Sequence, residues 1–174
     1  TDHSDNFTVR GALNRSFQSR SGDDSFLVLA FGVTSIADVE GDDTYVLASG
    51  EVNISDSEGD NQIGFRQYAS GTDAGVSIVV TDDGVTATTG DGSVSVEHAG
   101  RAETVVASRF DDSVQVLTTI GVATTIITLE GDDVVEARAG DERIDAGPGD
   151  DVVSGGVGDD TYVVAPGGAD IIRD

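Results

Sequence analysis

Several residue types that shape most domains are missing or scarce in this sequence. It contains no cysteine, methionine or tryptophan, and only 5% of its residues are aromatic. The absence of cysteine excludes a disulfide framework, a thiolate zinc site and a thiol nucleophile. The shortage of aromatic residues disfavours a globular enzyme whose core is packed around large rings. No run of about 18 apolar residues is present, so we expect no membrane insertion.

Lysine is also absent, because all nine basic residues are arginine. Against them stand 33 Asp and Glu residues, which give a net charge of −24. Nucleic acid and anionic membranes bind basic surfaces, so we expect neither as a partner. Hard cations are the natural counter-charge, although the same composition suits a salt-adapted protein whose carboxylates hold hydration. Short alternating runs of Val, Ile and Leu argue against disorder.

Nine-residue blocks follow one another without a gap near the carboxy-terminal end of the sequence. They read TLEGDDVVE (128–136), ARAGDERID (137–145), AGPGDDVVS (146–154) and GGVGDDTYV (155–163), and after Val164 a fifth follows as APGGADIIR. The glycines permit a tight turn whose carbonyls can approach an ion, and the Asp adds a carboxylate oxygen. The three residues after the Asp predict a short strand whose middle side chain points inward.

On these blocks the chain resembles the RTX, or hemolysin-type, calcium-binding nonapeptide family. The block at 155–163 matches the pattern G-G-x-G-x-D-x-U-x, with U apolar, at every fixed position. The resemblance implies a right-handed parallel β-roll in which two nonapeptides form one coil. It also implies calcium ions between successive coils, and secretion in an unfolded state at low calcium followed by folding outside the cell.

Upstream of residue 128 the glycines become rare, but the spacing persists as two ladders of acid-like positions just before inward apolar residues. The first ladder is Asp5, Asp24, Asp43, Asn61, Asp83, Glu103, a gap near Val122, Glu142 and Asp160. The second ladder is Asp73, Asp91, Asp112, Asp133, Asp151 and Asp170. The inward residues are Phe7, Phe26, Tyr45, Ile63, Val85, Val105 and Tyr162 on one side, and Val76, Val94, Val114, Val135, Val153 and Ile172 on the other.

No segment has the apolar periodicity of a helix, and stacked coils would place like residues above one another. We therefore predict an all-β protein, a parallel β-solenoid of about nine coils of about 18–22 residues. Degenerate coils span residues 1–127 and an RTX-type β-roll spans residues 128–174, continuous with each other as a single domain.

The resemblance assigns calcium ligands residue by residue and implies several Ca²⁺ ions. It pairs Asp133 with Asp151, and Asp151 with Asp170, on one edge, and Glu142 with Asp160 on the other. The carbonyl ligands that it implies are those of Gly131, Gly140, Gly147, Gly149, Gly156 and Gly158. Glu142 departs from the pattern, and we expect its longer side chain to carry the carboxylate outward. Asp24 and Asp43, whose turns contain one glycine instead of three, are further candidates, against the alternative of a solvated turn.

These features predict a calcium-binding module of a larger secreted or cell-surface protein, which folds and is stabilised on binding calcium. The alternative is an adhesin or surface-layer solenoid whose face binds carbohydrate, ice or further copies of the chain. A row of Asn, Thr or aromatic residues at one coil position would favour that alternative. Three Asn residues, Asn6, Asn14 and Asn53, lie in N-x-S/T sequons, which permit glycosylation of a secreted surface.

We predict no enzymatic activity. A solenoid enzyme that acts on polysaccharide would need clustered charged groups on one face, whereas lysine is absent, the two histidines are isolated, and the acids are mostly committed to turns. The enzyme alternative would gain support if Arg66, Arg101 or Arg109 converged with carboxylates in a groove.

Overall fold

Sixteen strands and no helix make up the part of the chain that the computed structural model describes, which is residues 3–11, 14–37, 40–56, 58–65, 75–82, 84–89, 92–98, 101–119 and 123–174. The strands are β1 (Asn6–Gly11), β2 (Arg15–Gln18), β3 (Ser25–Ala37), β4 (Thr44–Asp56), β5 (Asp60–Gly64), β6 (Ser77–Thr81), β7 (Gly84–Thr89), β8 (Gly92–His98), β9 (Arg101–Val106), β10 (Ser113–Val116), β11 (Thr125–Ile127), β12 (Val134–Ala137), β13 (Arg143–Gly147), β14 (Val152–Ser154), β15 (Thr161–Val164) and β16 (Ile171–Arg173). Within these residues no helix is long and apolar enough to span a bilayer.

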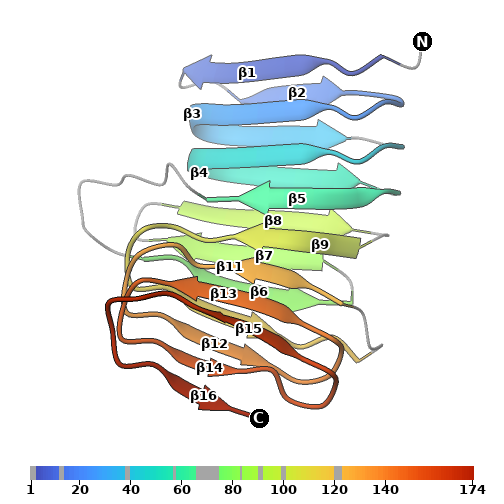
Figure 1. The fold of residues 1–174 in the computed structure, drawn as a ribbon. Coiled ribbons are helices and arrows are strands. Elements are labelled where there is room, and N and C mark those ends of the chain that lie inside the picture. The colour runs from blue at the N-terminus through green and yellow to red at the C-terminus, as the bar shows by residue number, and fades with distance from the viewer. Residues whose placement is uncertain are drawn as a thin grey trace.

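The strands stack along one axis, with the two ends of the chain at opposite ends of the stack (Figure 1). One parallel ladder of strands is called the first face. It is formed by β1, the start of β3, the start of β4, β5, β9, β11, β13 and β15. The second face contains β2, the ends of β3 and β4, β8, β7, β6, β10, β12, β14 and β16. The predicted parallel β-solenoid is therefore confirmed.

Coil spacing follows the sequence blocks. Thr125 pairs with Arg143, and Arg143 pairs with Thr161, so each step is one 18-residue pair of blocks. The steps of 19 at the amino-terminal end are also present, because Asn6 pairs with Ser25 and Ser25 with Thr44. Like side chains consequently lie above one another, as a solenoid requires.

One departure from the predicted ladder lies between β5 and β9. The sequence predicts a coil at Asp83 and Val85, but β7 pairs antiparallel with both β6 and β8, so Val85 belongs to a meander on the second face. Asp83 itself lies outside the described residues. The next first-face strand after β5 is β9, because Gln62 pairs with Thr104. Eight strands stand on the described first face, which gives about seven turns instead of about nine.

The cause of this difference is the local chemistry of the turn. Asp-Gly between alternating apolar residues is a strong signal for a tight antiparallel hairpin, and period-two alternation is the same in parallel and antiparallel strands. The turn before Gly84 closes β6 onto β7 and uses a positive φ of 144° at that glycine. The spacing alone could not separate this hairpin from another coil.

Two further ladder positions differ from the prediction. Val76 is buried in the core as predicted, but it stands level with Asp112, since Ser77 pairs with Ser113, and Ile78 is the inward residue level with Val114. The gap near Val122 is filled by Thr124, which is buried, and Ile126 points inward after it. Asp73 and Asp91 lie outside the described residues.

The core is a column of inward side chains from both faces. Phe26, Tyr45 and Ile63 follow one another on the first face, all at most 1% exposed. Phe7 stacks on Phe26 with ring centroids 4.7 Å apart, and Phe26 stacks on Tyr45 at 5.4 Å. On the second face the buried column includes Ile36, Ile54, Val114, Val135 and Val153. At the far edge of the sheet Ile172, on β16, is 44% exposed.

Candidate metal centre

The inner acids are the acidic residues that stand directly before the strands, and they form two buried rows along the edges of the solenoid. Those that are at most 3% exposed are Asp24, Asp43, Asp112, Asp133, Glu142 and Asp151. Asp160 and Asp170 are half-buried at the end of the rows. Burial of so many carboxyls requires partners for their oxygens.

One oxygen of each Asp in these rows bonds to the coil before it. Oδ1 of Asp133 accepts a hydrogen bond from the backbone N–H of Asp112 at 2.7 Å, and Oδ1 of Asp151 accepts one from Asp133 at 2.9 Å. On the other edge, Oδ1 of Asp160 accepts from Glu142 at 2.9 Å. Four further residues make the same contact. Oδ1 of Asp24 accepts from the N–H of Asp5, that of Asp43 from Asp24, that of Asn61 from Asp43, and that of Asp170 from Asp151. The inner acids therefore tie each coil to its neighbour.

The first Asp of each GDD triplet forms a second, exposed row that the sequence analysis missed. Oδ1 of Asp132 accepts from the N–H of Asp150, and Oδ1 of Asp141 accepts from Asp159, both at 2.9 Å. Asp23, Asp42, Asp111 and Asp150 make the equivalent contact with the following coil. The paired Asp residues of the motif were the sequence signal for this row. The first carboxylate of each pair accepts from the following coil and the second from the preceding coil.

Glycines bring the backbones of successive turns into direct contact. A β-carbon at Gly149 would overlap the carbonyl oxygen of Gly131, and a β-carbon at Gly158 would overlap that of Gly140. Gly147 lies in the same way against the carbonyl of Leu129. The turns can therefore stack so closely only where a side chain is absent. Of the carbonyls that the resemblance implies as ligands, those of Gly131, Gly140 and Gly149 lie in the contact region between coils.

Leu129 keeps the backbone shape of the motif although glycine has been lost. Its φ is 79°, close to the 81° of Gly147 and the 89° of Gly156 at the equivalent positions of later blocks. A bulky residue with such an angle is a genuine outlier, because its β-carbon crowds its own backbone. The loop before Asp133 thus has the same conformation as the glycine-containing loops after it.

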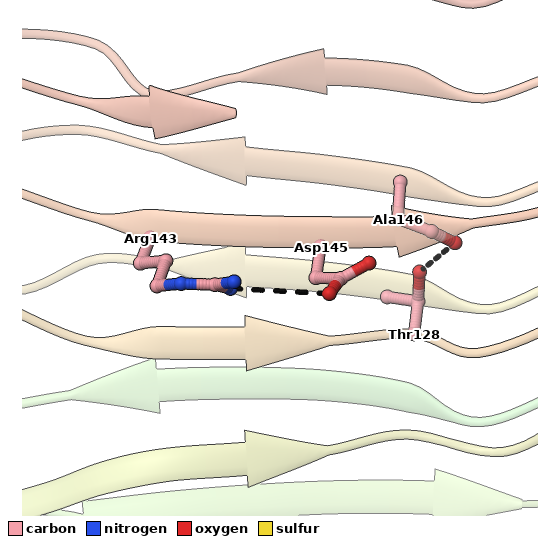
Figure 2. Close-up of polar contacts among 4 residues, drawn as sticks. All are labelled: Thr128, Arg143, Asp145 and Ala146. Atoms are coloured by element: carbon pink, nitrogen blue, oxygen red, sulfur yellow. Dashed lines mark hydrogen bonds and ion pairs between the residues drawn. The ribbon is translucent and has the colours of Figure 1, made fainter. Parts of the chain in front are cut away.

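The second carboxylate oxygen of the carboxy-terminal inner acids is buried and has no hydrogen-bond partner. This is so for Oδ2 of Asp133, Asp151 and Asp160 and for both carboxylate oxygens of Glu142. Thr128, the nearby hydroxyl, donates to the carbonyl oxygen of Ala146 at 2.8 Å, a contact between coils that Figure 2 shows. A buried carboxylate oxygen without a donor is costly unless a cation approaches it.

Glu142 differs most from expectation. Its carboxylate is 1% exposed rather than carried outward, because the side chain folds beneath the first face next to Asp160. Burial and, to a lesser degree, the neighbouring Asp160 carboxylate raise the pKa of Glu142 to about 7. Glu142 and Asp160 together therefore form a site where negative charge is concentrated and not balanced.

Asp133 and Asp151 form the matching site on the other edge. Burial raises the pKa of Asp133 to about 6, against the lowering effect of the hydrogen bond from Asp112. Burial also raises the pKa of Asp151, and the carboxylates of Asp170 and Asp132 add to this. Both groups are thus poised to exchange a proton for a cation.

Upstream turns have a different arrangement. Oδ2 of Asp24 accepts a hydrogen bond from the hydroxyl of Ser19, while its Oδ1 accepts from Asp5. Asp112 accepts three hydrogen bonds, from the N–H of Val76 at 2.5 Å and from the N–H and hydroxyl of Ser108 at 2.8 Å each. Asp43 is buried and accepts from the N–H of Asp24 at 2.7 Å.

The residues present fit a calcium ion at the carboxy-terminal turns. Among the described residues, no three His, Asp or Glu side chains converge to hold a metal by themselves. Calcium, however, accepts backbone carbonyls beside carboxylates and needs six to eight oxygens. Pairs of carboxylates from adjacent coils, with unpartnered oxygens and glycine carbonyls between them, provide that donor chemistry. The ligands would be Asp133, Glu142, Asp151, Asp160 and Asp170, with the carbonyls of Gly131, Gly140, Gly147, Gly149, Gly156 and Gly158.

The outer side of β13, beside this site, carries an ion pair. Arg143 and Asp145 project from the same side of β13 and approach each other to 3.9 Å between Nη1 and Oδ2 (Figure 2). Both side chains are partly exposed, so this ion pair contributes little to stability. The acids that matter for an ion are those of the turns.

The comparisons with known proteins agree with this placement. Residues 125–163 match the family model of the RTX calcium-binding nonapeptide repeat in four copies, and the search of curated proteins found no match. The predicted resemblance is confirmed over these residues. They hold Asp133, Glu142, Asp151 and Asp160, four acids with buried carboxylate oxygens that lack donors. Over residues 125–163 the chain is therefore similar to the RTX calcium-binding nonapeptide repeat, and this segment is built into a parallel β-solenoid.

Proposed function

We propose that this chain is a calcium-binding β-roll module of a larger secreted or cell-surface protein, and that its carboxy-terminal coils fold and are stabilised when calcium binds. The observation that carries this proposal is the set of buried, unpartnered carboxylate oxygens on Asp133, Glu142, Asp151 and Asp160. They coincide with the segment that matches the calcium-binding repeat.

The mechanism follows from charge. Without an ion, the inner acids of adjacent coils face each other across one coil spacing of about 4.8 Å and repel. A divalent cation between them replaces this repulsion with attraction and supplies the missing partner of each free oxygen. Because the unfolded chain does not hold these oxygens together, calcium binds the folded coils far more tightly, so binding and folding are linked.

Secretion is supported by the same linkage. A module that is expanded when calcium is scarce and compact when calcium is abundant suits export through a narrow channel followed by folding outside. The partly exposed last strand, with Ile171 at 50% and Ile172 at 44%, supports a neighbouring segment of a larger polypeptide that covers it.

The first prediction is that the β-sheet signal in circular dichroism depends on calcium. Chelator-treated protein should gain signal and thermal stability as calcium is titrated in, because the ion removes the repulsion between coils. Magnesium at the same concentration should be a poor substitute, since it requires a rigid octahedral shell and gives up water reluctantly.

Concentrated sodium chloride is the control for the salt-adapted alternative. If the full signal is present in chelator and does not change with calcium, ion-triggered folding is wrong. If sodium chloride alone produces the same gain as calcium, the carboxylates serve hydration and not specific ions.

A second candidate function rests on the outer surface of the first face. The residue that follows each ladder position is a short polar residue in most coils, and the row reads Asn6, Ser25, Thr44, Gln62, Thr104, Thr125, Arg143 and Thr161. Such a row at one coil position favours an adhesin or surface-layer solenoid that binds carbohydrate, ice or other copies of the chain.

The second prediction tests that row. If it is a binding surface, the calcium-loaded protein should be retained by immobilised polysaccharide or should inhibit ice recrystallisation, and Thr104→Glu should weaken the effect about tenfold by placing a charge in the row. Ser113→Glu, on the outer side of the second face, is the matched control. Absence of any effect in the unmodified protein would discard this candidate.

We propose no enzymatic activity. Arg109 is exposed in the loop before Asp112, Arg66 lies outside the described residues, and only the backbone of Arg101 is described. The buried acids of the described turns bond to backbone amides, which supports a structural use of them.

A further inference from the structure

The turns of this solenoid differ in how the second oxygen of the inner acid is satisfied. At Asp24 the donor to this oxygen is the hydroxyl of Ser19. At Asp112 it is the backbone N–H of Ser108, whose hydroxyl donates to the first oxygen of the same carboxylate. Ser108 is 1% exposed and its oxygen also accepts the N–H of Phe110, so it is held in place. These carboxylates are therefore complete without an ion.

The carboxy-terminal turns have no serine at the corresponding positions. Other residues stand four and five positions before these acids. They are Thr128 and Leu129 before Asp133, Ala137 and Arg138 before Glu142, Ala146 and Gly147 before Asp151, and Gly155 and Gly156 before Asp160. The one hydroxyl among them is on Thr128. It lies close enough to Asp133 to lower the pKa of that carboxyl, but it donates to the carbonyl of Ala146, and the turns of Glu142, Asp151 and Asp160 have no hydroxyl at these positions. The oxygens that Ser19 and Ser108 satisfy upstream are unpartnered here.

Two other upstream positions avoid the problem by carrying no charge. Asn61 accepts the N–H of Asp43 with its amide oxygen at 2.8 Å, as an Asp would. Thr124 occupies the position equivalent to Glu142 and is buried. Neither residue gives a cation a carboxylate to bind.

We propose that Ser19 and Ser108 take the place of calcium in their turns, so that the turns of Asp24 and Asp112 need no ion. Residues 3–119 then form a scaffold in chelator, and the coils from residue 123 onward are added when calcium binds. This inference rests on the proposed function and refines it. The edges of β9 and β10 that pair with β11 and β12 are the strand edges onto which those coils fold. Folding then proceeds from the amino-terminal coils toward the carboxy-terminal ones.

Hydrogen exchange on the whole chain, first in chelator and then with calcium ions alone, tests the direction of folding. We expect amides of β3, β4 and β10 to be protected in both conditions, and amides of β12, β13 and β14 to gain protection of about 100-fold or more only with calcium. Equal loss of protection in chelator along the whole chain would overturn the inference, as would full protection of both halves.

Calorimetric titration separates this inference from the proposed function. If no calcium binds, the proposed function itself is wrong. If calcium binds but protects both halves equally, the function stands and the division between the two kinds of turn is wrong.

Two matched variants test the serine-satisfied turns directly. Asp24→Asn and Asp151→Asn both keep the oxygen that accepts the amide of the preceding coil, and Asn61 shows that the solenoid tolerates this change. We expect Asp24→Asn to bind the same number of calcium ions with affinities within about twofold, and Asp151→Asn to lose an ion or to bind about tenfold more weakly. Loss of an ion in Asp24→Asn would overturn the inference.

Ser108→Ala is a second test of the serine-satisfied turns, which applies even if Asp24→Asn folds poorly. It should lower the thermal midpoint by about 3 °C in chelator and by a similar amount in calcium, since no ion compensates for the lost hydroxyl. Ser113→Ala, an exposed neighbour, is the control. A deficit that calcium abolishes would mean that Asp112 binds an ion, contrary to the inference.

Discussion

In the absence of calcium, the free energy of unfolding of the carboxy-terminal coils is expected to fall as the pH rises from about 4 to about 7, so that they are folded in acid and unfolded near neutral pH. The folded-state pKa of Asp133 is raised from 3.8 to about 6 and that of Glu142 from 4.5 to about 7, in both cases chiefly by burial. A raised carboxyl pKa stabilises the folded state fully below the unfolded pKa, and this stability is lost as the pH rises through the folded pKa. The two groups together should cost about 3 kcal/mol at pH 7.5, allowing for partial solvent screening.

Urea unfolding monitored by circular dichroism, at several pH values with and without calcium, measures this effect. With saturating calcium the trend should reverse, because the ion binds the ionised carboxylates and protons compete with it. Stability in chelator that is constant or increases between pH 4 and 7 would contradict the assignment of unpartnered carboxylates.

Asp133→Asn isolates one of the two groups. Its amide oxygen can still accept the N–H of Asp112, but the buried charge is gone. In chelator the variant should equal the unmodified protein near pH 4 and exceed it by about 2 kcal/mol above pH 6. In calcium the order should invert, since a ligand has been lost.

Gly149→Ala is expected to cause a large loss of stability, about 3 kcal/mol in the calcium-loaded protein. The new β-carbon would overlap the carbonyl group of Gly131, and Gly168 lies in the same way against the carbonyl of Gly149 in the next coil. Backbone atoms cannot move aside as a flexible side chain can. The coils would have to separate, which should also weaken calcium binding.

Gly64→Ala is the matched control. Gly64 is buried in β5, but a β-carbon there would meet Val106 at 3.8 Å and Tyr45 at 3.9 Å, which is ordinary contact. We expect a change within about 0.5 kcal/mol, measured by urea unfolding beside Gly149→Ala. Equal losses in the two variants would show that the close contact between turns is not what makes Gly149 sensitive.

The sequence predicted the coil register wherever the chain advances by whole nonapeptide pairs. The steps from Asp133 to Asp151 and from Glu142 to Asp160 correspond to the observed pairing of β12 with β14 and of β13 with β15. This was predictable because stacking of identical turns forces a constant repeat length. The antiparallel meander at β6 to β8 was not predictable from spacing, since its strands have the same alternation as a coil.

By itself the sequence determined the solenoid, its acidic edges and the family of its carboxy-terminal repeats, because periodic residues must occupy equivalent places in a stack. Only the tertiary structure decided which carboxylate oxygens have donors. Asp24 and Asp151 stand in similar GDD turns, yet the hydroxyl of Ser19 donates to the second oxygen of Asp24, whereas the second oxygen of Asp151 has no donor. That difference depends on how each loop folds around its acid, and a repeat pattern contains no information about it.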